Sequence, residues 1–439
     1  GLQHVMAMFI GNLTPLIIVM GVCGLTADAG FGELRTALLQ NAMIIAGVVT
    51  LVQMFSIGPV GGKVPIVMGT SSGFLGVLNN TVAACGGGIL AYGAIMGACI
   101  VGGIFESVLG AFLKPLRKFF PPIVTGSVVI AIGLSLLGVG INYFCGGSGK
   151  ADYGSLPNLF LGFVVLVVIV LLKHFAPQKS ILSSSAILFG ILAGYVVAII
   201  MTLTLPHTGI DADGVQYTYS WVVDFAQVKN AAWIAVPSFI GFGALSDVKI
   251  TFQASAIIPI GIMFIVTAIE TVGDISACIE GGMDREATDS ELSGGVICDG
   301  LGSAFAALFG VLPNTSFSQN VGLVSLTKVV NRFAISMGAI FLILCGLWPE
   351  IGALMSVMQQ SVLGGAAVML FASILISGIQ LITKHPIGSR EITIISVAIG
   401  LGYGLGATTG ATAHLPYYVQ LIFGSSGMVP CSVAAIILN

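Results

Sequence analysis

Two carboxylates inside an apolar stretch are the residues of this chain best suited to chemistry. Glu270 and Asp274 lie four residues apart between about Thr251 and Cys278, so on a helix they share one face. An acidic side chain at the centre of a bilayer costs about 2.5 to 3.5 kcal/mol to insert, and such acids mark substrate or proton pathways. An acid near a helix end, such as Glu280, instead reaches water. We therefore predict that Glu270 and Asp274 belong to a transport site.

The composition supplies the membrane that this argument needs. Of 439 residues, 56% are hydrophobic and 8% are charged, against roughly 25% charged in soluble domains. Charge-free intervals such as Lys118 to Lys150 and Asp299 to Lys328 each hold a helix of about 20 residues. The net charge of -3 and the dispersed basic residues give no nucleic-acid footprint. The expected fold class is an all-α polytopic membrane protein in a lipid bilayer.

Division of the apolar runs at proline, glycine and charged residues predicts fourteen transmembrane segments. They are expected at 2–25, 36–57, 63–78, 89–113, 120–141, 157–173, 181–205, 255–279, 294–310, 311–327, 332–349, 358–382, 391–409 and 416–438. This division gives a first seven-span repeat at 1–206, a connection at 207–249 and a second repeat at 250–439.

The basic residues predict the orientation. Eleven of the 15 Lys and Arg residues fall in even-numbered loops and four in odd-numbered loops. Because basic residues accumulate on the cytoplasmic side, both termini are expected in the cytoplasm and the 207–249 connection outside. The short loops favour a bacterial cytoplasmic membrane.

The third and tenth segments are too short and broken for ordinary spanning helices, and they resemble each other. Their shared pattern is glycine, proline, then Thr-Ser, found as Gly62, Pro65 and Thr70-Ser71 and again as Gly310, Pro313 and Thr315-Ser316. Seven spans separate the copies, so the second is inverted, and such paired broken segments point to a transporter's binding site. Irregular backbone at this depth survives only within protein or along a cavity. We expect short extended strands near 71–74 and 316–320, with half-helices after them.

A longer motif follows in the tenth segment. Residues 319–328 read Gln-Asn-Val-Gly-Leu-Val-Ser-Leu-Thr-Lys, which fits without departure the pattern Gln, Glu or Pro, then Asn-x-Gly, four residues, Thr, then Arg, Lys or Gly. Three further features stand at matching positions: Gln3-His4, Glu270-x-x-Gly273-Asp274 and Asp299-Gly300. In these residues the chain resembles the nucleobase-ascorbate transporter family of nucleobase:cation symporters.

The resemblance implies seven plus seven inverted spans, in which spans 1–4 and 8–11 form a core and spans 5–7 and 12–14 form a gate that mediates homodimerisation. Substrate is expected to cross as the core moves against the gate. The same resemblance implies Glu270 and Gln319 as substrate ligands, Phe74 stacked on the ring, and backbone near Ser318 assisting. A carboxylate accepts two N–H bonds from an oxopurine edge, and a Gln amide offers one donor and one acceptor.

Coupling to protons needs a group that changes protonation during transport. Asp274, one helical turn beyond Glu270, is the expected group by spacing and by resemblance. Asp299, His4 and Asn320 are expected to form its supporting network, and no cofactor or metal is expected.

Substrate choice depends on two positions. Gln319 resembles the purine branch of the family, which carries xanthine or urate, whereas uracil carriers tend to have Glu there. Gly73 departs from xanthine carriers, which often have Asn at this position. A missing side chain at Gly73 enlarges the pocket and is expected to admit the C8 oxygen of urate.

Three alternatives remain at this point. A uracil or other nucleobase symporter would share the fold, as would a sulfate or bicarbonate carrier, although Glu270 would repel an anion. An enzyme is disfavoured because Thr271-Val272-Gly273-Asp274 departs from the Gly-x-Gly-Asp of intramembrane aspartyl proteases, and His-Glu-x-x-His, Gly-x-Ser-x-Gly and P-loop motifs are absent from the sequence. The eight cysteines have no metal-ligand spacing and are expected to pack as small core residues.

Overall fold

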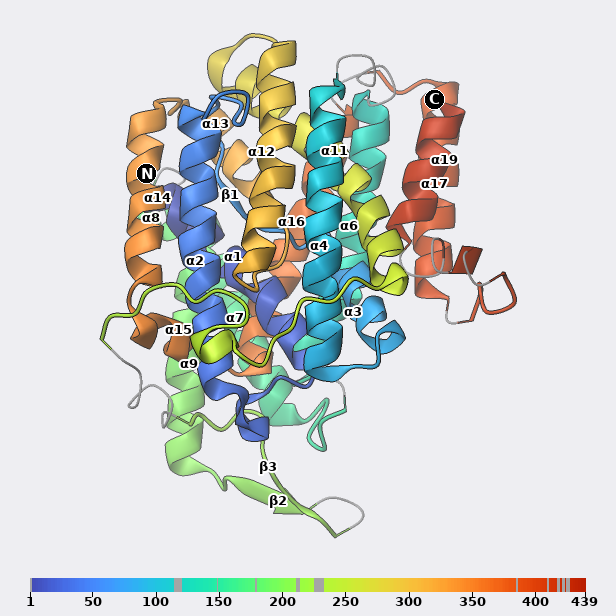
Figure 1. Ribbon diagram of the computed structural model, residues 1–439. Helices are drawn as coiled ribbons and strands as arrows, with labels where there is room; N and C mark the ends of the chain where they lie inside the picture. The colour runs from blue at the N-terminus through green and yellow to red at the C-terminus, as the bar shows by residue number, and fades with distance from the viewer. Residues whose placement is uncertain are drawn as a thin grey trace.

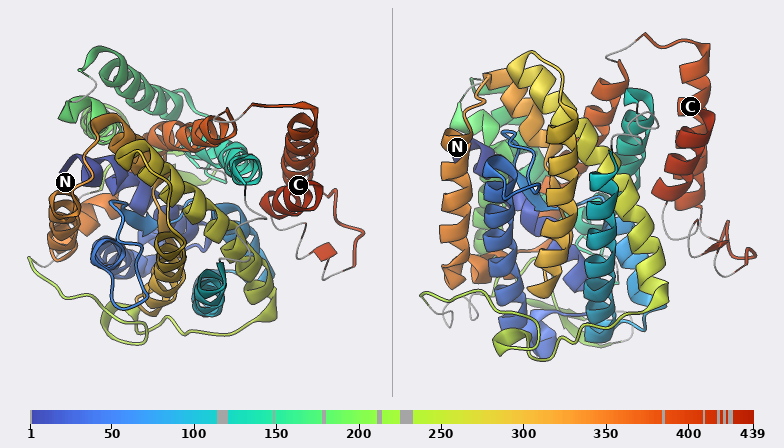
Figure 2. Two further views of the ribbon diagram at one scale, coloured as in Figure 1. Left: turned by 90° about the horizontal axis from the view of Figure 1, so that it is seen from above. Right: turned by 45° about the horizontal axis from the view of Figure 1, so that its top comes forward.

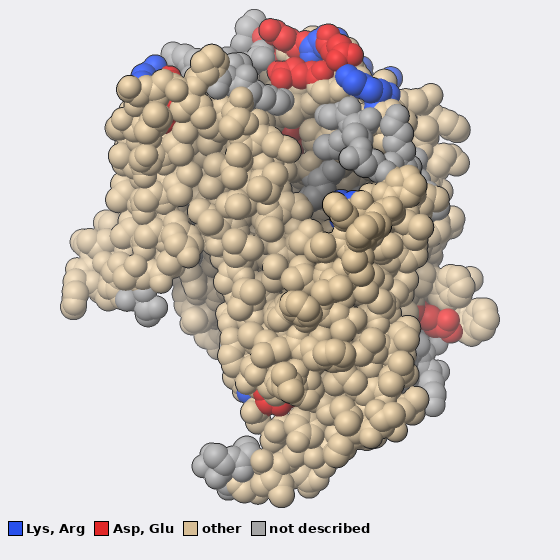
Figure 3. Space-filling view, turned by 180° about the vertical axis from the view of Figure 1, so that it is seen from behind, with Lys and Arg blue, Asp and Glu red and all other residues tan. Residues whose placement is uncertain are grey.

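On the face shown in Figure 3, the lateral surface is mostly uncharged, and most charged side chains lie towards the two ends of the molecule. The computed structural model describes residues 2–439 except 114–120, 148, 178–179, 211–213, 225–232, 384–385, 409, 417–418, 421–422 and 424–426. Helix α7 (Leu156–Phe175) exposes Phe160 and Phe163 by more than half, at 53% and 59%. Extended apolar surfaces of this kind mark contact with a membrane or a partner.

Helices occupy most of the positions at which spans were predicted. Within the described residues, seven helices are long and apolar enough to cross a membrane. These seven are α2 (Gly32–Phe55), α4 (Gly88–Ala111), α6 (Pro122–Phe144), α7, α9 (Ala186–Thr204), α11 (Ala254–Met283) and α16 (Gln360–Thr383). An eighth candidate is the pair α14 (Arg332–Gly346) and α15 (Pro349–Ser356), bent by 84°. The other helices of the bundle are α1 (Leu2–Val22), α12 (Asp289–Leu308), α17 (Ser389–Ala407) and α19 (Met428–Leu438), with one turn of helix at α8 (Ile181–Ser184).

The helices pack in pairs that join distant parts of the chain. Helix α4 lies along α12 and α11, α2 along α14, and α6 along α16 (Figure 1). Helices α17 and α19 lie together at one side of the molecule (Figure 2). At the α4–α12 contact, a Cβ on Gly103 would lie 2.4 Å from the Gly300 carbonyl oxygen, and a Cβ on Gly300 would lie 2.4 Å from that of Gly103. Glycine at both positions lets the two backbones touch, as small residues do between membrane helices.

The two broken segments are strand-helix units, as expected, and not continuous spans. Strand β1 (Met68–Thr70) precedes α3 (Leu75–Ala84), and strand β4 (Asn314–Ser316) precedes α13 (Ser318–Thr327). The strands pair antiparallel at the centre of the bundle, with Gly69 opposite Thr315. The extended stretches are shifted towards the N-terminus from the predicted 71–74 and 316–320, because residues 71–74 form a turn and α13 already begins at Ser318.

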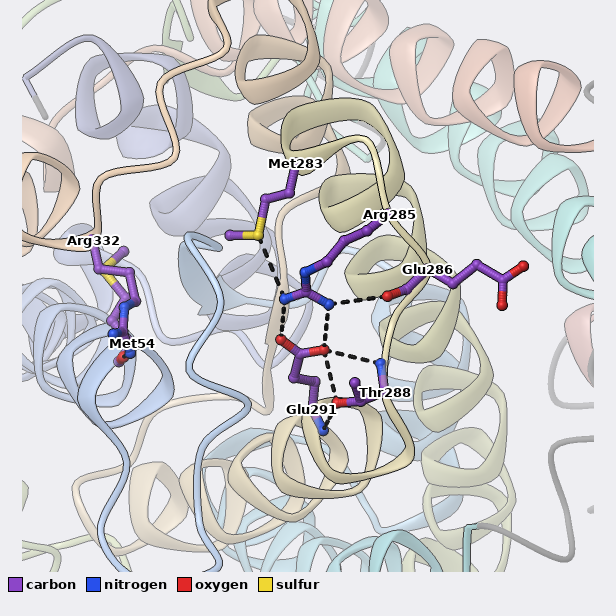
Figure 4. A network of polar contacts seen from close by, with 7 residues as sticks. All are labelled: Met54, Met283, Arg285, Glu286, Thr288, Glu291 and Arg332. Carbon is purple, nitrogen blue, oxygen red and sulfur yellow. Dashed lines mark hydrogen bonds and ion pairs between the residues drawn. The ribbon is translucent and has the colours of Figure 1, made fainter.

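The connection at 207–249 contains a two-stranded hairpin, β2 (Thr208–Ile210) with β3 (Gln216–Thr218), which projects from the end opposite the α11–α12 turn (Figure 1). At the α11–α12 turn, Arg285 binds both carboxylate oxygens of Glu291 (Figure 4). Glu291 also accepts the backbone N–H of Thr288, whose hydroxyl in turn caps α12. This capping box fixes the point at which the chain turns back into the bundle.

Candidate functional site

The β1–β4 pair is the frame of the site, and hydroxyl groups from two helices hold it. The Thr50 hydroxyl of α2 accepts the Met68 N–H at 2.9 Å and donates to the Met68 carbonyl at 3.1 Å. The Ser303 hydroxyl of α12 makes the same two bonds to Asn314, at 3.0 and 2.9 Å. Each strand thus has a hydroxyl that satisfies backbone groups which no water reaches.

Helix α1 completes the frame from the other side. Asn12 accepts the Thr70 N–H at 2.8 Å. A Cβ on Gly69 would lie 2.8 Å from Asn12 Oδ1 and 2.7 Å from the Phe317 ring, so only glycine fits there. Helices α3 and α13 start directly beyond the strands, and their first N–H groups present partial positive charge towards the centre. The arrangement favours a negatively charged or electron-rich group near these helix ends.

Two of the predicted acids, Asp274 of α11 and Asp299 of α12, lie against this frame. Asp274 accepts the Ser316 hydroxyl at 2.7 Å and the Ser318 hydroxyl at 3.0 Å, so α11 is tied to β4 and to the start of α13. Asp299 of α12 accepts hydrogen bonds from the hydroxyls of Thr271 and, at 3.3 Å, Thr315. Asp274 and Asp299, predicted from separate motifs, are therefore brought to opposite sides of one hydroxyl cluster.

Glu270 has a different environment, because part of its carboxylate is free. The residue is only 7% exposed, and its Oε2 atom has no hydrogen-bond partner among the residues that the structure describes. A Cβ placed on Gly73 would lie 3.6 Å from this oxygen, so the absent side chain of Gly73 leaves space beside it. An unpaired carboxylate oxygen at this depth is costly, and a ligand N–H group would satisfy it.

Phe74 is fully buried immediately before α3, with its ring edge-to-face to Phe264 at 4.7 Å between centroids. Its predicted contact with a substrate ring stays a prediction. Gln319 lies in the first turn of α13, but its side chain is outside the described part of the structure. The backbone near Ser318 was predicted to assist in substrate binding, and this stays a prediction. The Ser318 side chain donates a hydrogen bond to Asp274.

His4 and Asn320 form a pair of their own. The Asn320 amide donates to the His4 carbonyl at 3.0 Å and lies 3.4 Å from His4 Nδ1, which joins α1 to α13. Both residues are buried. Among the described residues, no hydrogen bond links this pair directly to Asp274 or Asp299, and its part in the predicted network stays a prediction.

The sequence analysis missed one acid of the site. Glu106 of α4 is completely buried and accepts the Thr267 hydroxyl of α11 at 3.3 Å, and its other oxygen has no partner in the described part of the chain. It lies next to the Gly103–Gly300 contact, close enough to Asp299 and Glu270 to interact with both electrostatically. A lone acid within segment 89–113 was a sufficient signal, by the same rule that identified Glu270.

The described residues contain no group of three or more His, Cys, Asp or Glu side chains arranged to hold a metal ion. Seven of the eight cysteines are buried, as expected for small core residues. What the centre offers is carboxylates, hydroxyls and helix N-termini, which can bind a polar heterocycle and exchange protons.

Comparison with solved structures identifies the fold. The transmembrane domain of a cyanobacterial bicarbonate transporter, BicA, aligns with a TM-score of 0.56 at 16% identity, covering 100% of this chain and 95% of the other. The murine anion transporter Slc26a9 aligns with a TM-score of 0.55 at 12% identity, over 99% of this chain and 68% of the other. At these identities the likeness concerns the fold alone.

Comparison of the sequence identifies the family. Residues 1–410 match the Permease family of xanthine and uric acid permeases. The xanthine permease of Bacillus subtilis is 34% identical over 100% of this chain and 92% of its own length. The uric acid permease PucK of the same species is 32% identical over 100% and 94%, and the uric acid transporter UacT of Escherichia coli 30% over 100% and 84%. The chain therefore belongs to this permease family, the nucleobase-ascorbate transporters that its motifs predicted, and is a multi-pass membrane transporter.

Proposed function

We propose that the protein imports a purine nucleobase, xanthine or urate, together with a proton across the cytoplasmic membrane. The observation that carries the proposal is the free Oε2 of Glu270, buried beside Gly73 at the start of α3. No described side chain donates a hydrogen bond to this oxygen, and an oxopurine presents N–H donors on its edge. The names of the relatives, which are xanthine and uric acid carriers, support the substrate class.

The proposed mechanism is an elevator movement of a core against a gate. We assign α1 to α4 and α11 to α14 to the core and α6 to α9 and α16 to α19 to the gate, with fourteen segments in two inverted repeats and both termini cytoplasmic. The matching hydroxyl contacts of Thr50 with β1 and of Ser303 with β4 support two related halves. A homodimer joined through the gate completes the proposal.

The test is uptake of radiolabelled xanthine into cells that express the wild type, Glu270→Gln or Glu280→Gln, with and without a protonophore. Glu280 is the matched control, because it is an exposed acid on the same helix. We expect protonophore-sensitive uptake, a loss of between about tenfold and a hundredfold for Glu270→Gln, since bonds to a charged acceptor are lost, and near wild-type uptake for Glu280→Gln.

Competition by unlabelled urate, uracil and sulfate ranks the alternatives. Urate is expected to block xanthine uptake, and uracil and sulfate are not. Uptake of radiolabelled sulfate without uptake of any nucleobase would instead favour an anion carrier, the alternative that the fold of the two solved structures keeps open. Uptake of xanthine that does not depend on Glu270 would contradict the assigned site.

A further inference from the structure

Three hydroxyl groups connect the two buried aspartates. Thr271 donates to Asp299, and Ser316 donates to Asp274 at 2.7 Å. The Thr271 and Ser316 oxygens lie 3.4 Å apart, and those of Thr271 and Thr315 lie 3.2 Å apart. A continuous path of oxygen atoms therefore runs from Asp299 through Thr271 and Ser316 to Asp274.

The number of protons in this path limits what it can do. A hydroxyl carries one proton, and those of Thr271, Thr315 and Ser316 all point to a carboxylate. As long as both aspartates are ionised, they only accept hydrogen bonds. The Thr271 and Ser316 hydroxyl protons then point to the carboxylates, and no proton lies between the two hydroxyl oxygens. If Asp299 brings a proton of its own, it donates to Thr271, and the Thr271 hydroxyl is free to turn towards Ser316.

We propose that Thr271 and Ser316 relay a proton between Asp299 and Asp274. In one direction, the Asp299 O–H bond breaks as a bond forms to Thr271 Oγ1, Thr271 passes its original proton to Ser316 Oγ, and Ser316 passes its original proton to Asp274 Oδ2. Each hydroxyl ends with one proton, and one proton has moved from one carboxyl to the other. The reverse sequence returns it. This inference rests on the proposed proton symport and assigns its internal path.

The surroundings of the path favour a relay within the protein. All three hydroxyl residues are at most 4% exposed. Within the described residues, neither aspartate forms an ion pair with Lys or Arg, so no basic side chain there favours the ionised form of either carboxyl. Within the described part of the chain, the other titratable side chains close enough to interact electrostatically with these two carboxyls are Glu106, Glu270, Cys278 and Cys298.

Thr271→Val tests the relay, because valine keeps the shape of threonine and removes the hydroxyl. Thr271→Ser restores a hydroxyl at the same atom. Thr315→Val is the matched control: like Thr271→Val, it removes one hydrogen bond to Asp299, but it leaves the path through Thr271 and Ser316 in place. Each variant is purified, reconstituted in liposomes and assayed for xanthine binding, xanthine counterflow and xanthine-dependent proton entry, the last with a trapped pH-sensitive dye.

For Thr271→Val we expect binding and counterflow within about fivefold of wild type, the effect of one lost hydrogen bond, as for Thr315→Val. We expect xanthine-dependent proton entry to fall by about a hundredfold in Thr271→Val alone and to recover in Thr271→Ser. Full proton entry in Thr271→Val, or equal losses in Thr271→Val and Thr315→Val, would overturn the relay while the symport stands. If the wild-type protein takes up xanthine without proton entry, both the proposed symport and the relay are wrong.

Discussion

Gly73 is the residue at which this chain differs most informatively from the expectation for a xanthine carrier. Its backbone has no left-handed conformation that would demand glycine, and a Cβ there would make ordinary contacts with Ser71, Met263 and Glu270 at 3.4 to 3.6 Å. The glycine is therefore not required by the backbone or by packing. What it provides is space beside the free oxygen of Glu270.

Substitution of this glycine is expected to change substrate preference. Gly73→Asn places an amide next to Glu270 and fills the space that we assign to the C8 oxygen of urate. We expect inhibition of xanthine uptake by urate to weaken by about tenfold or more, the usual effect of one group in a pocket, with smaller change for xanthine itself. Competition assays in cells check this. Gly73→Ala is the control, and an equal loss of both substrates in Gly73→Asn would contradict the assignment.

Residue identity also explains which parts of the site the sequence could predict. Glu270 and Asp274 stand out because charge is rare in apolar runs, and Asp299 stands at a position that matches the family. All three are buried, and hydrogen bonds tie Asp274 and Asp299 to β4. Thr271 was passed over because threonine is ordinary in a membrane helix, and its importance appears only when Asp299 and Ser316 approach it from other elements. Hydroxyl networks of this kind depend on contacts between residues far apart in the sequence, and the spacing of residues along the chain does not predict such contacts.

At the scale of elements, β1 and β4 depend on the helices that brace them. Thr50 alone satisfies both backbone groups of Met68, so Thr50→Val leaves a buried N–H and a buried C=O without partners. We expect a loss of about 1 to 3 kcal/mol of stability, seen as a lower thermal midpoint in detergent. Thr50→Ser keeps the hydroxyl and is expected to lose less. Equal midpoints for the two variants would show that packing of the methyl group matters more than the brace.

The turn between α11 and α12 is expected to respond to acid. Hydrogen bonds from Arg285 lower the pKa of Glu291 from 4.5 to about 2. Because the folded-state pKa is the lower one, the stabilisation is complete above about pH 4.5 and is lost as the pH falls towards 2. The effect of an exposed ion pair is about 1 kcal/mol or less.

Thermal midpoints of wild type and Glu291→Gln at several pH values check this. The wild type is expected to be the more stable at pH 7, and the difference is expected to narrow progressively below about pH 4.5. A difference that stays constant down to pH 3 would mean that Glu291 acts through its neutral contacts with Thr288, not through its charge.

At the scale of the whole molecule, hydrophobicity predicted where most helices lie. Of the fourteen predicted segments, seven within the described residues are helices long and apolar enough to cross a membrane, or eight if the bent pair is counted. Proline and glycine identified 63–78 and 311–327 as discontinuous, and the structure has a strand and a short helix in each. The pairing and register of the two strands could not be predicted, because a three-residue strand has too few alternating polar and apolar side chains to specify its partner. Glu106 adds a buried acid from α4, a helix that the sequence analysis assigned to the core without singling out this residue.

The pairing of β1 with β4 also concerns how the protein is made. The ribosome delivers β1 early, yet its partner strand is synthesised only after most of the chain has entered the membrane. Until then, β1 holds a polar edge inside the bilayer with Thr50 and Asn12 as its native supports. A nascent chain released before Ser316 therefore lacks the strand that pairs with that edge. Completion of the two-stranded sheet thus reports that both halves of the transporter have been inserted.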